Sequence, residues 1–167
     1  MDGKQLKYNW FITDAQNCHI KSPYYELFSE NPYCFISGEE LTKIENDENA
    51  QWIFGVLSAI PKDVPLEEVL KYEYPYANGY TGFWKNPITM QHPHAVIEIV
   101  PWDGELILVI SSDEDLIEKI HQKIPNAIDL YEDNIRVQKI REEQEKKENK
   151  ERFIQKLFHL FRRIRPR

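Results

Sequence analysis

Two strand-like runs separated by an Asp-Gly pair constrain the fold of this chain more than any other feature. The runs are 95–100 (AVIEIV) and 105–110 (ELILVI), with PWDG between them. Asp and Gly both tolerate the positive φ angles of a tight hairpin turn. The pattern therefore predicts an antiparallel hairpin. Because the second run is apolar on both faces, we expect it to be a central strand of the sheet.

Strand and helix patterns alternate in the rest of residues 1–134. Aromatic and β-branched runs predict strands at 6–12, 33–36 and 51–60. Helices are predicted at 38–46, where Ser37 and Glu40 have capping-box spacing, in a short piece after Asp63, and from Ser112 to Pro125. The last helix has an inward stripe of Leu116, Ile117, Ile120 and Ile124. This order predicts an α+β fold in which helices cover an antiparallel or mixed sheet.

The chain ends in a long helical pattern that changes character along its length. From Ile135 the pattern is continuously helical, and 141–152 (REEQEKKENKER) contains no apolar residue. Opposite charges four positions apart, such as Glu148 and Arg152, favour a solvated single helix there. A basic amphipathic pattern follows. We therefore divide the chain into an acidic α+β domain (1–134), a charged helical spacer (135–152) and a basic amphipathic helix (153–167).

Charge divides at the same boundary. Residues 1–134 carry 23 acidic and nine basic residues, a net charge of −14, whereas 135–167 carry 12 basic residues and five acids, a net charge of +7. Nucleic-acid phosphates need Lys and Arg to replace their counterions, so we do not expect the acidic part to bind nucleic acid. A basic protein partner suits this charge. The simpler alternative is that the acids only keep the protein in solution.

Two groups of residues in the acidic part are candidates for binding such a partner. Acids at predicted helix starts would steer association, and exposed aromatic rings would supply affinity. The aromatic group lies in 71–84 (KYEYPYANGYTGFW), where one proline and two glycines argue against a regular element. The candidates are Glu39, Glu40, Asp113, Glu114 and Asp115, and, in the aromatic segment, Tyr72, Glu73, Tyr74, Tyr76, Tyr80 and Trp84. The alternative for the aromatic segment is a long turn whose rings cover the edge of the core.

The apolar face of the C-terminal helix is a separate candidate. Its residues are Phe153, Ile154, Leu157, Phe158, Leu160 and Phe161, with Arg162 and Arg163 beside them. Such a helix can lie on an anionic membrane or associate with a second chain. It can equally pack on its own domain, because helices in proteins gain most of their stability from packing.

Residues with catalytic or metal-binding chemistry are sparse. His92 and His94, with Glu98 on the same predicted strand face as His94, are a weak candidate for a metal or hydrolase site, since Pro93 disturbs the geometry. We favour ordinary histidines at the edge of a loop. Cys18 and Cys34 form neither a disulfide framework nor a Cys-x-x-Cys pair, so buried thiols are expected. No catalytic residue, metal ligand or cofactor is therefore predicted, and enzymatic activity stays open, with a non-enzymatic role favoured.

Three functional hypotheses follow. The first is a non-enzymatic acidic protein that recognises a basic protein partner; bacterial immunity proteins against nuclease toxins share this size and charge, and the abundance of Lys, Glu, Ile, Asn and Tyr favours a bacterial or phage source. The second is a peripheral membrane or assembly adaptor anchored by the C-terminal helix. The third is a small hydrolase or metal enzyme around His92 and His94. With no signal-peptide pattern and no apolar run of membrane-spanning length, a cytoplasmic location is expected, with the inner membrane face as an alternative.

Overall fold

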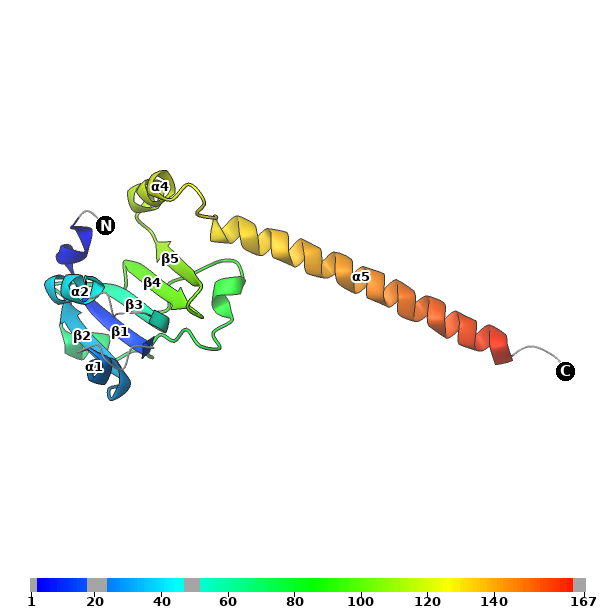
Figure 1. Ribbon diagram of the computed structural model, residues 1–167, viewed down its shortest axis with the longest axis horizontal. Coiled ribbons are helices and arrows are strands. Elements are labelled where there is room, and N and C mark those ends of the chain that lie inside the picture. The colour runs from blue at the N-terminus through cyan, green and yellow to red at the C-terminus, as the bar shows by residue number, and fades with distance from the viewer. Residues whose placement is uncertain (1–2, 18–23, 47–51, 164–167) are drawn as a thin grey trace. The chain divides into compact units, whose positions relative to one another are not determined.

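The computed structural model of the chain describes residues 3–17, 24–46 and 52–163 (Figure 1). Of residues 157–163 only the backbone is described. The chain divides into two units, Met1–Ala127 and Ile128–Arg167, and each is described by itself below. Cys18 lies outside the described residues.

The first unit contains a five-stranded sheet in which every pair of neighbours is antiparallel. The strand order is β2-β1-β3-β4-β5. The strands are β1 (Tyr8–Asn17), β2 (Tyr33–Ser37), β3 (Trp52–Pro61), β4 (Ile97–Trp102) and β5 (Leu106–Ser111). Together with the helices described below, this sheet confirms the α+β fold class and resolves the choice between antiparallel and mixed in favour of antiparallel.

The β4–β5 hairpin forms as the sequence predicts, but its second strand is not central. Asp103 and Gly104 have φ angles of 53° and 68°, and the Trp102 carbonyl accepts a hydrogen bond of 3.2 Å from the Glu105 N–H. β5 is an outer strand of the described sheet, and Ile107 on it is 71% exposed. The expectation of a central strand was wrong because apolar side chains project from the faces of a strand, whereas its neighbours pair with its backbone edges.

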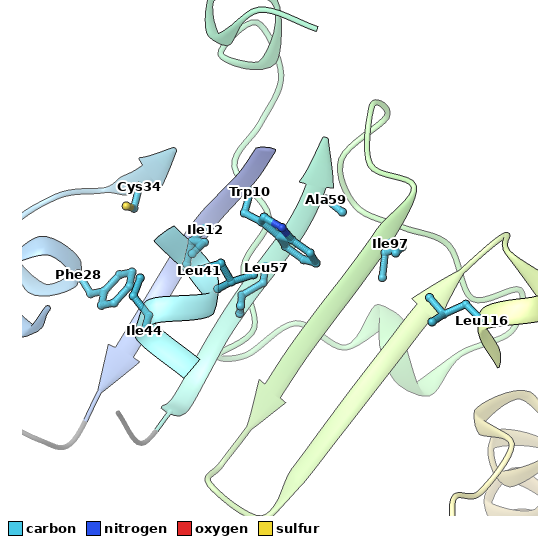
Figure 2. Close-up of a cluster of buried hydrophobic side chains, with 10 residues drawn as sticks. All are labelled: Trp10, Ile12, Phe28, Cys34, Leu41, Ile44, Leu57, Ala59, Ile97 and Leu116. Atoms are coloured by element: carbon cyan, nitrogen blue, oxygen red, sulfur yellow. The ribbon is translucent and has the colours of Figure 1, made fainter. Parts of the chain in front are cut away.

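Helices cover one face of the sheet. Trp10 and Ile12 of β1 share this face with Leu57 and Ala59 of β3, as the strand register requires. Figure 2 shows these side chains packed with residues of the covering helices. Those helices are α1 (Tyr25–Ser29), which the sequence pattern did not predict, α2 (Gly38–Glu45) and α4 (Glu114–Lys123). Trp10 is 0% exposed, so its ring is fully enclosed in the hydrophobic core on this face.

An irregular segment, 62–96, covers the opposite face. Phe11 of β1 and Ile60 of β3 are buried there, next to Val69 and Ala95 of the segment. Only two short helical pieces interrupt the described segment, namely α3 (Leu66–Val69) and the 3-10 helix η2 (Gly82–Trp84). This face is therefore closed mainly by loop backbone, which must find its hydrogen-bond partners outside regular structure.

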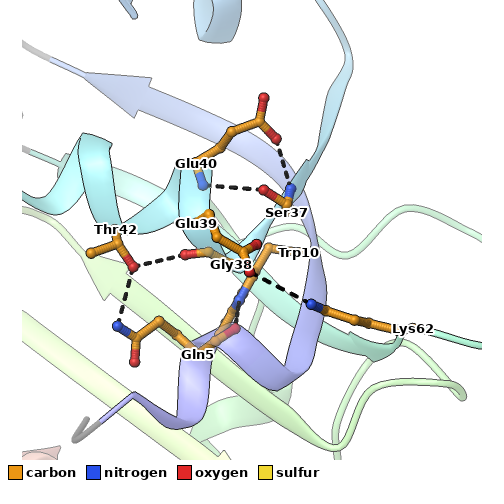
Figure 3. A network of polar contacts seen from close by, with 8 residues as sticks. All are labelled: Gln5, Trp10, Ser37, Gly38, Glu39, Glu40, Thr42 and Lys62. Atoms are coloured by element: carbon orange, nitrogen blue, oxygen red, sulfur yellow. Dashed lines mark hydrogen bonds and ion pairs between the residues drawn. The ribbon is translucent and has the colours of Figure 1, made fainter.

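The start of α2 is stabilised by the predicted capping box. Ser37 Oγ accepts from the Glu40 N–H at 3.2 Å, and Glu40 Oε2 accepts from the Ser37 N–H at 2.9 Å (Figure 3). The 3-10 helix η1 (Lys4–Lys7) lies against this helix start. A Cβ on Gly38 would approach the Gln5 carbonyl oxygen to 2.1 Å, so this close approach requires glycine.

Two predicted boundaries shift in the structure. Residues 6 and 7 belong to η1, so β1 starts at Tyr8 and runs on through polar residues to Asn17. The N-cap of α4 is Asp113 and not Ser112, because the Asp113 carboxylate accepts from the Leu116 N–H at 3.0 Å. The shift at α4 occurs where a polar side chain finds a specific backbone partner, which the hydrophobic pattern does not record.

The second unit contains the helix α5 (Leu130–Arg163). Every residue from 141 to 152 is exposed, and Glu148 pairs with Arg152 at 3.8 Å. The predicted long C-terminal helix is thus confirmed, and Phe153 and Ile154 on it are 62% and 41% exposed. The side chains of Leu157, Phe158, Leu160, Phe161, Arg162 and Arg163 lie outside the described part. Among the described helices none is both long enough and apolar enough to span a membrane.

Candidate functional site

The aromatic segment 71–84, called the tyrosine segment below, is fixed to β1 by two polar side chains. Thr13 Oγ1 donates to the Pro75 carbonyl oxygen at 2.6 Å. Asp14 Oδ2 accepts from the Ala77 and Asn78 N–H groups at 2.8 and 2.7 Å. Hydrogen bonds to a charged acceptor are among the stronger ones in proteins. The middle of the tyrosine segment therefore has a defined backbone position although it contains no strand or helix.

Gln91 holds the same segment from the other side. Its Oε1 accepts from the Tyr76 N–H at 3.1 Å, and its Nε2 donates to the Tyr76 carbonyl at 3.0 Å. One amide side chain thus satisfies both backbone groups of one residue, as a neighbouring strand would. Tyr76 is consequently positioned by its backbone, which leaves its ring available at the surface.

A buried carboxylate fixes Gln91 in turn. Glu98 is 0% exposed and accepts from the Gln91 N–H at 2.9 Å and from the His92 N–H at 2.8 Å. Ser58 Oγ lies 3.4 Å from Oε1 of the same carboxylate. Burial raises the pKa of Glu98, and the backbone N–H groups of His92 and Gln91 partly oppose this rise. Glu98 therefore serves as a structural acceptor for the loop that precedes β4.

His92 is a core residue and not a loop-edge histidine as expected. It is 0% exposed, and its Nε2 lies 3.1 Å from the Val69 carbonyl while its Nδ1 accepts from the His94 N–H at 3.2 Å. These partners assign the proton to Nε2, and burial lowers the pKa of the ring, so His92 is neutral. Both ring nitrogens are occupied by backbone groups, which leaves neither for a metal ion or a proton transfer.

The other described residues with metal-binding or nucleophilic chemistry do not gather into a metal site. Within them, no group of three or more His, Cys, Asp or Glu side chains is arranged to hold a metal ion. The Glu98 carboxylate binds the backbone before β4 instead of joining His94 in a site. Cys34 is buried, and burial raises the pKa of its thiol to about 11, which keeps it protonated and unreactive at neutral pH.

Three tyrosine rings of the tyrosine segment reach the surface. Tyr72, Tyr74 and Tyr76 are 40%, 39% and 49% exposed. Tyr72 packs edge-on against His94 with ring centres 5.3 Å apart, and Tyr74 packs against Phe11 at 5.5 Å. Each of these two rings thus has one side on the core and another in solvent. Glu73 lies between them in sequence and is exposed.

The remaining two aromatic candidates, Tyr80 and Trp84, are less accessible. Tyr80 packs on the fully buried Phe83 with ring centres 4.6 Å apart, and Trp84 packs on Trp102 at 5.3 Å. Both are half-buried. They support the exposed rings and cover the core edge, as the interpretation of the segment as a long turn over the core predicts.

The acidic candidates divide between structural and exposed positions. Glu40 completes the α2 capping box, Asp113 caps α4 and accepts from Lys4 Nζ at 2.6 Å, and Glu39 pairs with Lys62 at 3.8 Å. Glu114 and Asp115 are exposed in the first turn of α4. These acids lie at the N-termini of helices that cover the Trp10 face, whereas the tyrosine segment covers the Phe11 face. The two candidate groups therefore belong to opposite layers.

Sequence reasoning missed the residues that hold the tyrosine segment in place. Thr13 and Asp14 lie more than 60 positions before the backbone groups they bind, and Gln91 lies 15 positions after its partner. A positive φ of 49° at Asp14 is the one local peculiarity, and it cannot be read from residue type alone. Comparisons of the chain with family models, curated proteins and solved structures gave no match.

Proposed function

We propose that the first unit is a non-enzymatic binding module that recognises a basic protein partner through Tyr72, Tyr74 and Tyr76 and the carboxylate of Glu73. The observation that carries the proposal is the fixed backbone beneath three partly exposed tyrosines. A surface ordered before binding loses little conformational entropy on association. Tyrosine adds large contact area with few rotatable bonds, which is why it is frequent at binding hot spots.

Charge supports a basic partner in preference to a neutral or acidic one. Residues 1–134 have a net charge of −14, and Glu73 lies within the tyrosine segment. Lys71, which precedes Tyr72 in the sequence, pairs with Glu68 at 2.5 Å, so the charge of this lysine is compensated by its own partner. Complementary charge accelerates the encounter of two proteins and weakens with added salt.

The test is affinity purification of the tagged full-length chain from its native cells at low and high salt. Alongside the unmodified chain we would use Glu73→Lys combined with Tyr76→Ser, because both side chains are exposed and their loss leaves the backbone anchors intact. The expected result is one basic protein retained by the unmodified chain, released by high salt and lost from the double variant. The matched control is Glu105→Lys, an exposed position in the hairpin turn with the same charge change.

Equal capture by the double variant and by the control would contradict a tyrosine-segment interface. If the double variant and the control lose capture equally, the interaction depends on net charge alone. Capture that resists high salt would remove the electrostatic part of the proposal, because exposed charge pairs are screened at high ionic strength.

A second function, peripheral membrane attachment through α5, is favoured by the exposure of Phe153 and Ile154 directly after a stretch without apolar residues. The full chain would be sedimented with vesicles of anionic and of neutral lipid. Binding to anionic vesicles that Phe153→Ser with Ile154→Ser abolishes, and that the exposed control Gln155→Ser retains, is the expected result. Absence of vesicle binding by the unmodified chain would refute this function.

A further inference from the structure

A cavity of about 520 Å³ opens between α4, η1 and the hairpin strands of the first unit. This volume lies in the range of small-molecule sites, about 300–1,000 Å³. Its apolar floor is formed by Ile99 of β4 and by Ile107 and Val109 of β5. The strand register places Ile99 opposite Val109, so these side chains project from the same face of the sheet. The cavity lies on the helix-covered side, away from the tyrosine segment.

The wall of the cavity is the inner face of α4. Leu116, Ile120 and Ile124 line it at helical spacing, whereas the stripe was expected to face only the core. Leu116 is 4% exposed and completes the core, but Ile124 is 55% exposed. The apolar stripe is therefore longer than the core that it covers, and its last turn faces the cavity.

Four lysines complete the lining. Lys4 and Lys7 come from η1, and Lys119 and Lys123 come from α4, one helical turn apart. Residues 1–134 contain nine basic residues in all, so almost half of them gather at this cavity in the most acidic part of the chain. Lys4 also donates to Asp113 Oδ2 at 2.6 Å, which ties η1 to the start of α4 and holds two walls together.

We propose that this cavity binds a small amphiphile with an anionic head and an unbranched apolar tail, of the fatty-acid class. The apolar floor and wall would bury the tail, and Lys7 and Lys119 would meet the carboxylate. Burial of apolar area supplies affinity without direction, whereas the charge at the rim fixes which end enters and rejects cationic ligands. This proposal is independent of the protein partner proposed for the tyrosine segment.

Charge argues against the chain's own C-terminal segment as the occupant. Residues 153–167 carry Lys and Arg with no acid, so they would bring like charges to a lysine-lined rim. Another possible occupant is a second copy of the first unit, which would have to cover Ile107 and the exposed end of α4. The experiment below separates this outcome from binding of an amphiphile.

The test is isothermal titration of the full chain with dodecanoate, dodecyltrimethylammonium and dodecanol, with the two ionic probes below their micelle concentrations and the alcohol below its solubility limit. The three probes share one tail and differ in head charge. Saturable binding of dodecanoate, at least about tenfold tighter than the neutral alcohol and weakened by salt, is the expected result. Equal binding of the cationic probe, or no binding of dodecanoate, would overturn the proposal.

Variants locate the site. Lys7→Glu with Lys119→Glu is expected to raise the Kd of dodecanoate about tenfold or more, because charge-assisted contacts are replaced by repulsion. Ile107→Trp is expected to abolish binding by filling the cavity, and since Ile107 is 71% exposed the fold tolerates the larger ring. Lys85→Glu combined with Lys62→Glu, with the same charge change outside the cavity, is the control.

Two results would refute the assignment. Equal weakening by the control pair would show a response to net charge only. A concentration-dependent dimer of the unmodified chain that Ile107→Glu dissociates, without dodecanoate competing, would assign the cavity to self-association. Circular dichroism of every variant shows whether loss of binding reflects loss of fold.

Discussion

The face of the sheet that carries Trp10 is covered by helices, whereas the face that carries Phe11 is covered by the irregular segment 62–96. On the helix-covered face, each helix satisfies its own backbone except at its ends, where side chains such as Ser37 and Asp113 act as caps. On the segment-covered face, the backbone depends on Thr13, Asp14, Gln91 and Glu98 for hydrogen bonds. The comparison shows that an irregular layer needs polar partners along its backbone, whereas a helical layer needs them only at the helix ends.

The largest effect is expected on the helix-covered face. Trp10→Ala removes a fully buried ring and its bond of 3.1 Å to the Gln5 carbonyl, and should lower the free energy of unfolding by about 3–5 kcal/mol. Urea unfolding followed by circular dichroism measures it. A loss below about 1 kcal/mol would mean that this cluster is not the principal core.

A smaller and more local effect is expected from the carboxylate beneath the segment. Glu98→Gln replaces an acceptor of backbone N–H groups by an amide that brings its own donors, and should cost about 1–3 kcal/mol. Hydrogen exchange measured by NMR should speed up at the Gln91 and His92 amides in the variant more than it does at the amides of α2. Glu105→Gln, at an exposed position, is the control and should change little. Uniformly faster exchange would argue against a separate layer.

Asp14 offers a matched test of the anchor on the tyrosine segment. Asp14→Gly removes the carboxylate, while glycine still tolerates the positive φ of 49°. The free energy of unfolding should fall by about 1–2 kcal/mol, because the N–H groups of Ala77 and Asn78 lose their acceptor. Trypsin should then cut faster after Lys71 and Lys85. Asp103→Gly makes the same change at another residue of positive φ, in the hairpin turn, and should leave cleavage unchanged.

The helical cap should contribute about as much as one anchor. Ser37→Ala removes the acceptor for the Glu40 N–H and should cost about 1 kcal/mol, measured by thermal or urea unfolding. Ser37→Asp retains an acceptor and is expected to restore most of the loss. If Ser37→Asp does not restore the stability, Ser37 acts through packing on η1 and not through the cap.

The smallest predicted effect is a contrast in pH dependence between the two faces. Backbone N–H bonding at Ser37 lowers the pKa of Glu40 below 4.5, so its stabilisation is present above the unfolded-state pKa and is lost as pH falls through the folded-state value. Burial raises the pKa of Glu98, so the folded state holds that proton more tightly, and its contribution declines as pH rises from 4.5 through the raised value. The difference in free energy of unfolding between the unmodified chain and each variant, plotted against pH, should therefore have opposite slopes for Glu40→Gln and Glu98→Gln. Slopes of one sign would contradict this assignment.

The sequence predicts those parts of the fold and site whose causes are local. The hairpin at Asp103-Gly104, the capping box of Ser37 and Glu40 and the long C-terminal helix all arise from residues within a few positions of one another. Residues 71–81 also form neither strand nor helix, as Pro75, Gly79 and Gly82 suggest. The short helix α1 was missed because five residues carry too little periodicity to show a face.

By itself, then, the sequence determined the five strands, the helices α2, α3, α4 and α5, the hairpin turn, the capped start of α2 and the division of charge along the chain. The tertiary structure alone decided that β5 is an outer strand, that His92 is buried and neutral, and that Thr13 and Asp14 hold the tyrosine segment. It alone brought lysines near both ends of the first unit to one cavity. The physical reason is range: turns and caps depend on neighbours in sequence, whereas burial, anchoring and cavities depend on residues that only the folded sheet brings together.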